Sequence, residues 1–330
     1  MTSDMRTVFS ARFTSSVLIA YMLVVNGRAL AQDYPTKPLR CIVPYSAGGS
    51  SDFVARLLAQ KLTDAWGQQV LVENRPGAAG NIGAETVVRA PPDGYTMLLV
   101  SSTFATNPSL YPKLAFDSVK DFAAVTMVLW QPFILSAHPS LPVASVTQLI
   151  VLAKARPGEL NFSTGGNGTS GHIAAELFMT MAGIRMAHVP YRSMAPAITA
   201  LLTGEVHINF NSPLSALEYM KAGKVKALAV TGRQRLGSMP NIPTVSESGV
   251  PGFEEGNWQG VLLPTATPRA IVVKLNQEIV RIANSREVSE RVRNMGADLI
   301  ANTPEEFAAT IRSDIAKYAA VVKAARIRAE

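Results

Sequence analysis

The stretch P-Y-S-A-G-G-S-S-D, from Pro44 to Asp52, decides how this chain of 330 residues folds. The apolar run 39–43 before it predicts a buried strand, and the apolar residues after it recur at helical spacing. The two adjacent glycines permit backbone conformations closed to other residues, and the following Ser-Ser-Asp is favoured at helix starts. A helix that begins there leaves N–H groups free at the positive end of its dipole, which suits an anion. Taken alone, such a turn is also a common tight connection in α/β proteins.

A second stretch, S-T-G-G-N-G-T-S-G-H from Ser163 to His172, has the same organisation. It follows a short strand at 160–162 and opens an amphipathic helix marked by apolar residues at helical spacing. Because the two stretches lie in separate halves of the chain, we expect them to face one another across a ligand-binding cleft.

The order of the remaining elements predicts an α/β fold. A strand at 69–73, a helix that ends near 90 and a strand at 97–101 follow the first helix. This alternation is typical of a mostly parallel sheet flanked by helices. Ser101 and Thr103 lie at the carboxyl end of the third strand, where such sheets bind their ligands.

Two segments predict crossings between two domains, since about 300 residues exceed the usual size of a single core. The apolar run 124–137, interrupted by Gln131-Pro132, indicates a strand that leaves one domain and enters the next. A return is expected at 258–263, where Trp258 either packs in the hinge or lines the cleft. The expected domains are therefore 32–131 plus 258–330, which form a discontinuous domain 1, and 132–257, which form domain 2.

The first 31 residues predict a secretory signal peptide. Arg6 and Arg12 precede an apolar core at 17–25, and Ala29-Leu30-Ala31 matches an A-x-A cleavage site. The alternative, an N-terminal anchor helix, needs about 20 apolar residues, roughly twice the length of this core. We expect cleavage after Ala31 and a soluble protein in the periplasm.

Charge and cysteine content exclude several classes of protein. The leader contains three of the 31 basic side chains and one of the 24 acidic ones, so the mature chain keeps a net charge of about +5. The basic residues are scattered without interleaved aromatic residues, so no nucleic-acid partner is expected. Cys41 is the only cysteine and lies in a predicted strand, which indicates a buried apolar role and no intramolecular disulfide.

The motifs of the common enzyme and metal classes are absent. The four histidines lack H-E-x-x-H spacing, so neither a metal nor another cofactor is expected. Gly166, Gly168 and Gly171 spell G-x-G-x-x-G, but the acidic residue that a dinucleotide site needs about 20 positions later is missing. The chain has no G-x-S-x-G nucleophile elbow either, so we do not expect an enzyme.

Six strings together carry a family resemblance. The chain resembles the Bug family of solute-binding proteins, the extracytoplasmic receptors of tripartite tricarboxylate transporters, over essentially all of its mature length. The strings are P-Y-S-A-G-G-S-S-D, V-E-N-R-P-G-A-A-G-N-I-G-A-E, P-P-D-G-Y-T-M-L-L, H-V-P-Y-R-S-M-A-P-A-I, A-G-K-V-K-A-L-A-V-T and N-I-P-T-V-S-E-S-G-V-P-G-F.

The resemblance implies a two-domain periplasmic-binding-protein, or Venus flytrap, fold that closes on a small organic carboxylate. In that family main-chain N–H groups and ordered water from the two Gly-rich loops grip the ligand. Carried over to this sequence, the ligand-binding residues are Tyr45, Ser46, Ala47, Gly48, Gly49, Asp52, Ser101, Thr103, Thr164, Gly165, Gly166, Gly168, Thr169, Ser170, His172, Tyr191 and Asn211. For His172 a ligand contact and a helix-capping role stay equally open.

The resemblance also implies the partners and leaves alternatives open. We expect a monomer that delivers its ligand to membrane permease subunits; a receptor for a signalling partner and an exported enzyme are the alternatives. Relatives commonly carry Asp where this chain has Asn211, so we expect a mono- or dicarboxylate without an amino group. Arg192 is the one cation near the cleft in sequence, and it either engages a second carboxylate or lies on the solvated surface.

Overall fold

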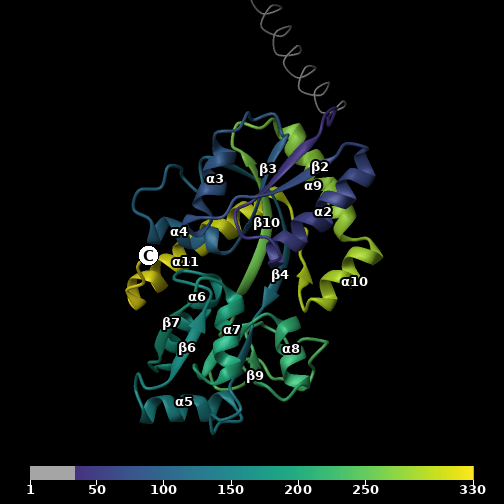
Figure 1. The fold of residues 1–330 in the computed structure, drawn as a ribbon. Coiled ribbons are helices and arrows are strands. Elements are labelled where there is room, and N and C mark those ends of the chain that lie inside the picture. Colours follow the sequence, from purple (N-terminus) through teal and green to yellow (C-terminus); the bar gives the residue numbers. More distant parts are fainter. Residues whose placement is uncertain (1–33, 330) are drawn as a thin grey trace, which may run out of the picture.

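The structure, a computed structural model, describes residues 34–329. The predicted signal peptide and its cleavage site lie outside the described residues. The described chain forms two lobes, one above the other in Figure 1, and each lobe is built around its own β-sheet. We call the lobe with the six-stranded sheet the first lobe and the lobe with the five-stranded sheet the second lobe.

The first lobe combines the N-terminal part of the chain with its C-terminal part. Its strands, in sheet order, are β11 (Asp298–Leu299), β4 (Phe122–Pro132), β10 (Gly256–Pro264), β3 (Thr96–Ser101), β1 (Leu39–Val43) and β2 (Val70–Asn74). Its helices are α2 (Ser50–Trp66), α3 (Asn81–Val88), α4 (Thr103–Leu110), α9 (Arg269–Ala283), α10 (Arg286–Asn294) and α11 (Pro304–Ala325), with a short 3-10 turn at Ala78–Gly80 before α3.

Both faces of the first sheet are covered, which the alternation of side chains along the strands makes possible. Cys41 and Val43 of β1 pack in the core with α2, α9 and α10, whereas Ile42 between them packs in the core with α3, α4 and α11. The prediction that Cys41 is a buried apolar residue is confirmed: burial of its thiol raises the pKa to about 12.

The second lobe has one large core between its sheet and helices, and two smaller clusters. Its strands, in sheet order, are β7 (Ala187–Pro190), β6 (Asn161–Thr164), β8 (Ile208–Asn211), β5 (Ile134–Ala137) and β9 (Lys226–Val230). Its helices are α5 (Val146–Ala155), α6 (Ser170–Ala182), α7 (Met194–Thr203) and α8 (Pro213–Lys221). The two smaller clusters include residues of α7 and α8.

The predicted two-lobed α/β architecture is confirmed, with one correction: both sheets are mixed rather than mostly parallel. β1 pairs in parallel with β2 and β3, but β10 pairs antiparallel with both β3 and β4. In the second lobe β6 pairs in parallel with β7 and β8, whereas β5 pairs antiparallel with β8 and β9. The reason is that the strands next to the lobe junction carry the chain in opposite directions between the lobes, so they cannot all run parallel to their neighbours.

The chain changes sheet between Pro132 and Ile134, and again between Val230 and Gly256. Hydrogen bonds of Thr231 tie these crossings together: its hydroxyl accepts from the N–H of Phe133 at 2.7 Å and donates to the carbonyl of Glu255 at 2.6 Å. Nearby, Trp258 is 2% exposed and donates its indole N–H to Asp314 of α11 at 2.7 Å. Trp258 therefore packs inside the first lobe, which excludes the alternative that it lines the cleft.

Within residues 34–329, no helix combines the length and the apolar character needed to span a bilayer.

Candidate functional site

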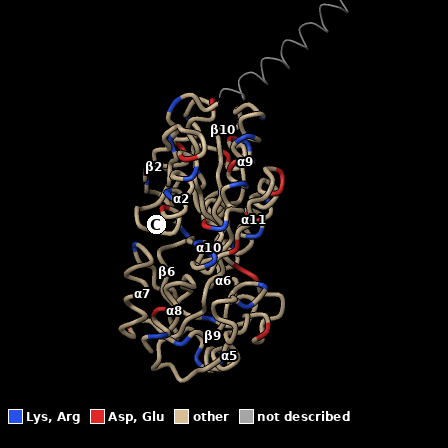
Figure 2. Tube along the Cα trace, turned by 90° about the vertical axis from the view of Figure 1, so that its right-hand side faces the viewer, with Lys and Arg blue, Asp and Glu red and all other residues tan. Residues whose placement is uncertain are grey.

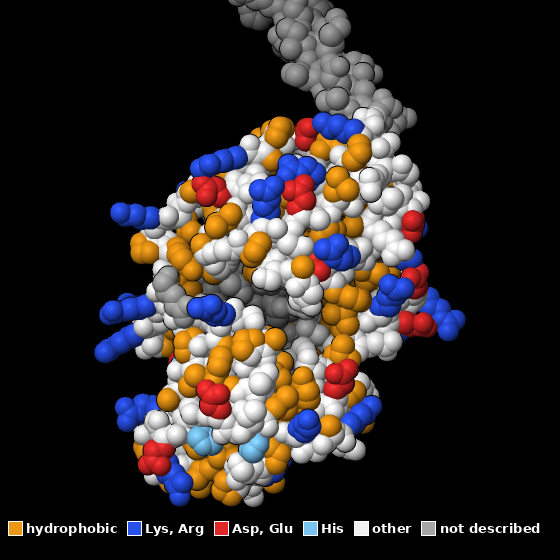
Figure 3. Space-filling view, in the orientation of Figure 1, with side chains coloured by type: hydrophobic (Ala, Val, Ile, Leu, Met, Phe, Trp, Pro, Cys, Tyr) orange, Lys and Arg blue, Asp and Glu red, His pale blue; other side chains and the backbone are white. Residues whose placement is uncertain are grey.

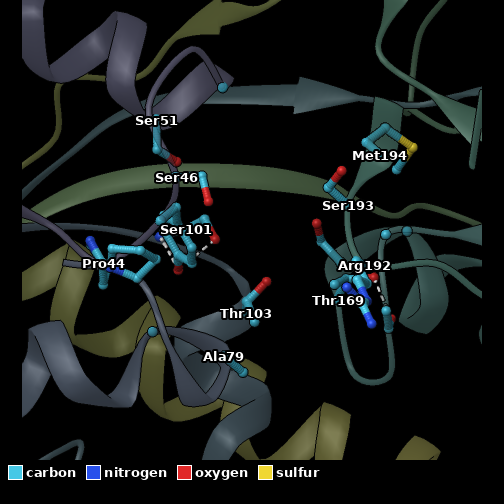
Figure 4. Close-up of a pocket in the computed structure, with 18 of the residues that line it drawn as sticks. Pro44, Ser46, Ser51, Ala79, Ser101, Thr103, Thr169, Arg192, Ser193 and Met194 are labelled. Atoms are coloured by element: carbon cyan, nitrogen blue, oxygen red, sulfur yellow. Dashed lines mark hydrogen bonds between the residues drawn. The ribbon is translucent and has the colours of Figure 1, made fainter. Parts of the chain in front are cut away.

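A cavity of about 490 Å³ lies between the two lobes. Figure 3 shows the surface hollowed at this junction, and Figure 4 shows side chains of the two lobes facing one another across the gap. Ser46, Ser101 and Thr103 approach from the first lobe, and Thr169 and Arg192 approach from the second. The two Gly-rich stretches thus meet at one cavity, as the sequence predicts.

Three helix N-termini are directed at this cavity, and none of them is capped by a side-chain hydrogen bond. α2 begins after Gly49, α6 after Thr169 and α7 after Ser193, and all three of these preceding residues line the cavity. The Thr169 hydroxyl donates instead to the carbonyl of Gly166 at 2.9 Å. Uncapped first turns present free N–H groups and the positive end of the helix dipole, so the cavity favours a negatively charged group.

Tyr45 fixes the first Gly-rich loop against the sheet. Its hydroxyl accepts hydrogen bonds from the Ser101 hydroxyl at 2.8 Å and from the Ser101 N–H at 3.2 Å. Burial raises the pKa of Tyr45 above its ordinary value, so the phenol stays neutral. Tyr45 and Ser101, 56 residues apart in the chain, therefore form one wall of the cavity.

Asp52 braces the same loop from behind. Its carboxylate accepts hydrogen bonds of 3.0 Å from the N–H of Gly48, from Arg56 Nε and from Asn74 Nδ2. Burial raises the pKa of Asp52, but these three donors outweigh that effect and hold it below its ordinary value. Asn74 also donates to the carbonyl of Tyr45 at 3.1 Å. The negative charge of Asp52 is thus matched by protein donors and does not face the cavity.

A third loop that the sequence analysis did not assign to the site lines the cavity next to the first. Gly77, Ala78, Ala79 and Gly80 all have positive φ angles, of 129°, 46°, 52° and 94°, and alanine seldom adopts such angles. Asn107 of α4 holds this turn by donating to the carbonyl of Ala79 at 3.0 Å. The sequence signal was present in N-R-P-G-A-A-G, which has the same glycine-rich character as the two loops that were assigned.

Other lining residues also escaped the sequence analysis. They are Pro44, Ser50, Ser51, Pro76, Tyr111, Asn167, Gly171, Ser193, Met194 and Asn257. Most of them are immediate neighbours of predicted positions, whereas Tyr111 and Asn257 come from elements that carry no motif.

Ten of the seventeen predicted residues line the cavity and seven do not. The ten are Tyr45, Ser46, Gly49, Ser101, Thr103, Gly165, Gly166, Thr169, Ser170 and Tyr191. The seven outside its lining are Ala47, Gly48, Asp52, Thr164, Gly168, His172 and Asn211.

Five of the seven residues outside the lining are buried in protein, whereas Ala47 and Gly48 are exposed. Gly168, with φ +71°, packs against Leu110 of α4, so that a Cβ at this position would overlap the Leu110 side chain. His172 is 3% exposed and accepts a hydrogen bond from the Gly168 N–H. Asn211 is fully buried on β8, a strand that is buried along its whole length, and it is not among the residues that line the cavity.

Charge is sparse in the cavity lining. Arg192 is the only charged side chain among the described residues that line it, and no Asp or Glu side chain is among them. The phenol of Tyr191 donates to Glu205 at 2.8 Å, so this carboxylate is already paired. Over the described chain as a whole, basic and acidic residues are interspersed, as Figure 2 shows. No cluster of three or more His, Cys, Asp or Glu residues within 34–329 is suited to hold a metal ion.

Comparison with known proteins identifies this architecture. A family model described as "Tripartite tricarboxylate transporter family receptor" matches residues 54–327. The chain belongs to this receptor family. Its curated relatives include Protein BugT of Bordetella pertussis, 36% identical over 89% of this chain and 90% of the relative. Another is the "UPF0065 protein in tcbD-tcbE intergenic region" of Pseudomonas sp. strain P51, 33% identical over 99% and 97%.

Solved structures agree with this assignment. The receptor resembles the structure "R. palustris Rpa4515 with adipate" with a TM-score of 0.82 and 35% identity, over 90% of this chain and 99% of that one. It also resembles the periplasmic binding protein BugD, with a TM-score of 0.78 and 32% identity over 89% and 99%. The predicted Bug-family membership and two-domain periplasmic-binding-protein fold are therefore confirmed. The family is one of periplasmic solute-binding receptors that work with tripartite transporters, not a family of enzymes.

Proposed function

We propose that this receptor captures a small organic carboxylate between its lobes and delivers it to the membrane permease subunits of a tripartite tricarboxylate transporter. The observation that carries the proposal is the convergence of three uncapped helix N-termini on one cavity whose described lining contains no acidic side chain. Free N–H groups and hydroxyls stabilise a carboxylate by oriented dipoles and bridging water. Two solved relatives support this ligand class: one is titled as an adipate complex, and the malate complex of MatC from Rhodopseudomonas palustris has a TM-score of 0.78 at 29% identity.

We propose that the ligand lacks an amino group. An ammonium group bound in a cavity requires an acidic partner, and none is present in the described lining. This reason replaces the one drawn from the sequence, since Asn211 is fully buried and is not part of the described lining.

Arg192 is the candidate contact for a second carboxylate. It is exposed at the cavity wall of the second lobe, and no hydrogen bond or ion pair joins its side chain to another described residue. A dicarboxylate held at one end by the N-termini of α2 and α6 would present its other end to this guanidinium, whose planar donors match a carboxylate.

We also propose how the receptor is processed and where it acts. The signal peptide 1–31 is removed after Ala31, and the mature protein acts as a monomer in the periplasm. The two domains, 32–131 plus 258–330 and 132–257, close about the crossings near Thr231 when the ligand binds.

The direct test is mass spectrometry of the molecule released from protein purified under native conditions, with a thermal-shift panel of carboxylic acids and amino acids. Stabilisation by carboxylic acids such as adipate is expected. Stabilisation by amino acids alone would contradict the ligand class.

A matched pair of variants tests the role of Arg192. Arg192→Gln should weaken adipate binding about tenfold and leave hexanoate, which has a single carboxylate, nearly unchanged, because only the distal carboxylate loses its partner. Arg185→Gln, at the opposite end of β7 on the same lobe, is the control. Equal losses of affinity for adipate and hexanoate would show that Arg192 does not bind the distal carboxylate.

A further inference from the structure

Two stacked histidines lie under the second Gly-rich loop, outside the described lining of the cavity. The ring centroids of His172 and His188 are 3.8 Å apart, with an angle of 22° between the ring planes. His172 comes from the first turn of α6 and His188 from β7, so the pair joins two elements that flank the loop. Phe162 of β6 stacks on His188 with ring centroids 4.9 Å apart, and its ring centroid lies 6.1 Å from that of His172.

Each ring is tied to a different point of the loop. The buried N–H of Gly168 donates to His172 Nδ1 at 3.1 Å. The other ring, His188, shares a hydrogen bond of 2.7 Å between its Nε2 and the Thr164 hydroxyl, and this hydroxyl accepts from the Gly166 N–H at 3.2 Å. The pair therefore fixes both limbs of the loop whose Gly165, Gly166, Thr169 and Ser170 line the cavity.

The hydrogen bond from Gly168 also specifies the chemical form of His172. Because Nδ1 accepts, it carries a lone pair, and the proton of the neutral ring lies on Nε2, which faces Glu176 Oε1 at 3.4 Å. Burial, the largest cause, lowers the pKa of His188 to about 3, so this ring is neutral as well. Two neutral imidazoles can stack closely without the repulsion that two cations would suffer.

We infer that His172 and His188 are positioning residues that hold the second loop in its ligand-binding conformation through Gly168 and Thr164, without touching the ligand. This inference rests on the proposed function, since the conformation matters through the N–H groups that it presents to a carboxylate. It replaces both roles that the sequence left open for His172. The ring is neither a ligand contact nor a helix cap in the ordinary sense, because its acceptor serves the loop that precedes the helix.

The test uses two substitutions of one residue with opposite expectations. In His172→Asn the side-chain oxygen takes the place of Nδ1 and can still accept from Gly168, whereas His172→Phe keeps a ring and removes the acceptor. Calorimetry with adipate as the probe should show binding about tenfold weaker for His172→Phe and within about threefold of wild type for His172→Asn.

His207→Asn is the matched control. His207 Nδ1 accepts from the N–H of Asn161 at 3.1 Å, which is the same kind of bond at the end of β6 that points away from the cavity. This variant should bind adipate as the wild type does. An equal loss of affinity in His172→Asn and His172→Phe would overturn the inference, since packing alone would then explain both.

Two measurements that need no ligand test the positioning role independently of the proposed function. Hydrogen exchange monitored by mass spectrometry should be faster over 164–170 in His172→Phe, whether or not wild type binds any acid in the panel. In wild-type protein near neutral pH, ¹⁵N resonances of the imidazole should report a neutral His172 with its proton on Nε2. Unchanged exchange over this segment in folded His172→Phe would refute the positioning role. A proton on Nδ1 of the wild-type ring would refute it even if His172→Phe does not fold. Failure of the wild type to bind any carboxylate would refute the proposed function alone.

Discussion

Replacement of Asp52 by Asn tests whether the first Gly-rich loop is held from behind. Asp52 is 5% exposed and accepts from Gly48, Arg56 and Asn74, each at 3.0 Å. An amide keeps one acceptor oxygen and presents an NH₂ group in place of the other. Whichever way this amide is turned, its NH₂ group then faces at least one of those donors.

The expected loss can be worked out from these contacts. Hydrogen bonds to a charged group contribute about 1.5–3 kcal/mol each, and the amide loses at least one of them, so the free energy of unfolding should fall by about 2 kcal/mol. The loop 46–49 becomes freer at the same time, and fixing one residue's backbone costs about 1–2 kcal/mol. If ligand binding has to restore the order of a single residue, affinity for adipate falls about tenfold.

Urea unfolding and calorimetry measure the two losses separately. Asp64→Asn is the control, because Asp64 is exposed on the same helix and the substitution makes the same change in charge. A wild-type unfolding midpoint for Asp52→Asn would refute the bracing role of this carboxylate. Lower stability with unchanged affinity would show that the loop keeps its conformation without Asp52.

Three further outcomes are expected from substitutions, and one from the wild-type receptor. Tyr45→Phe removes the acceptor of the buried Ser101 N–H and should lower the free energy of unfolding by about 1–3 kcal/mol in urea titrations. Gly48→Ala should cost about 1–2 kcal/mol by the same measurement, because φ is +83° there, although the added Cβ would meet no atom within 4 Å. The pKa of His188 is about 3 in the folded protein against about 6.5 in the unfolded chain, so wild type should lose stability as the pH falls from about 6.5 toward 3. His188→Phe should lack this part of the dependence of the unfolding free energy on pH. If the variant and wild type show the same pH dependence, His188 is not the group responsible. X-ray scattering should show a smaller radius of gyration for wild type saturated with adipate, whereas a constant value would indicate a receptor that is closed beforehand.

The parts of the site that the sequence predicted are those that depend on local pattern. A strand, a Gly-rich turn and a helix start follow one another within a dozen residues, so both loops and the cavity between them could be anticipated from 39–52 and 160–172. Their meeting at one cavity required only that strand ends of the two sheets face each other.

The parts that sequence reasoning missed depend on contacts between distant residues. Two adjacent alanines do not by themselves indicate positive φ angles. Ala78 and Ala79 adopt such angles in a turn that Asn107, 28 residues away from Ala79, holds by a hydrogen bond. Likewise, residue type alone could not distinguish Asp52 and His172, which brace the loops from beneath, from residues that point into the cavity. Packing decides which way a side chain points. Because β8 is buried on both faces, neither side of this strand exposes Asn211 to solvent.

The division of donors between the lobes also bears on how a receptor of this kind releases its ligand. The N-terminus of α2 belongs to the first lobe, and those of α6 and α7 belong to the second. On the proposed function, a carboxylate reaches both sets of N–H groups only when the lobes approach, so the closed form has the higher affinity. Opening removes part of the donors at once, and it needs neither a proton transfer nor the breaking of a buried ion pair. A partner that binds the open form more tightly than the closed form would therefore weaken the binding of the ligand. The binding free energy that the ligand loses equals the difference between the partner's binding free energies for the two forms.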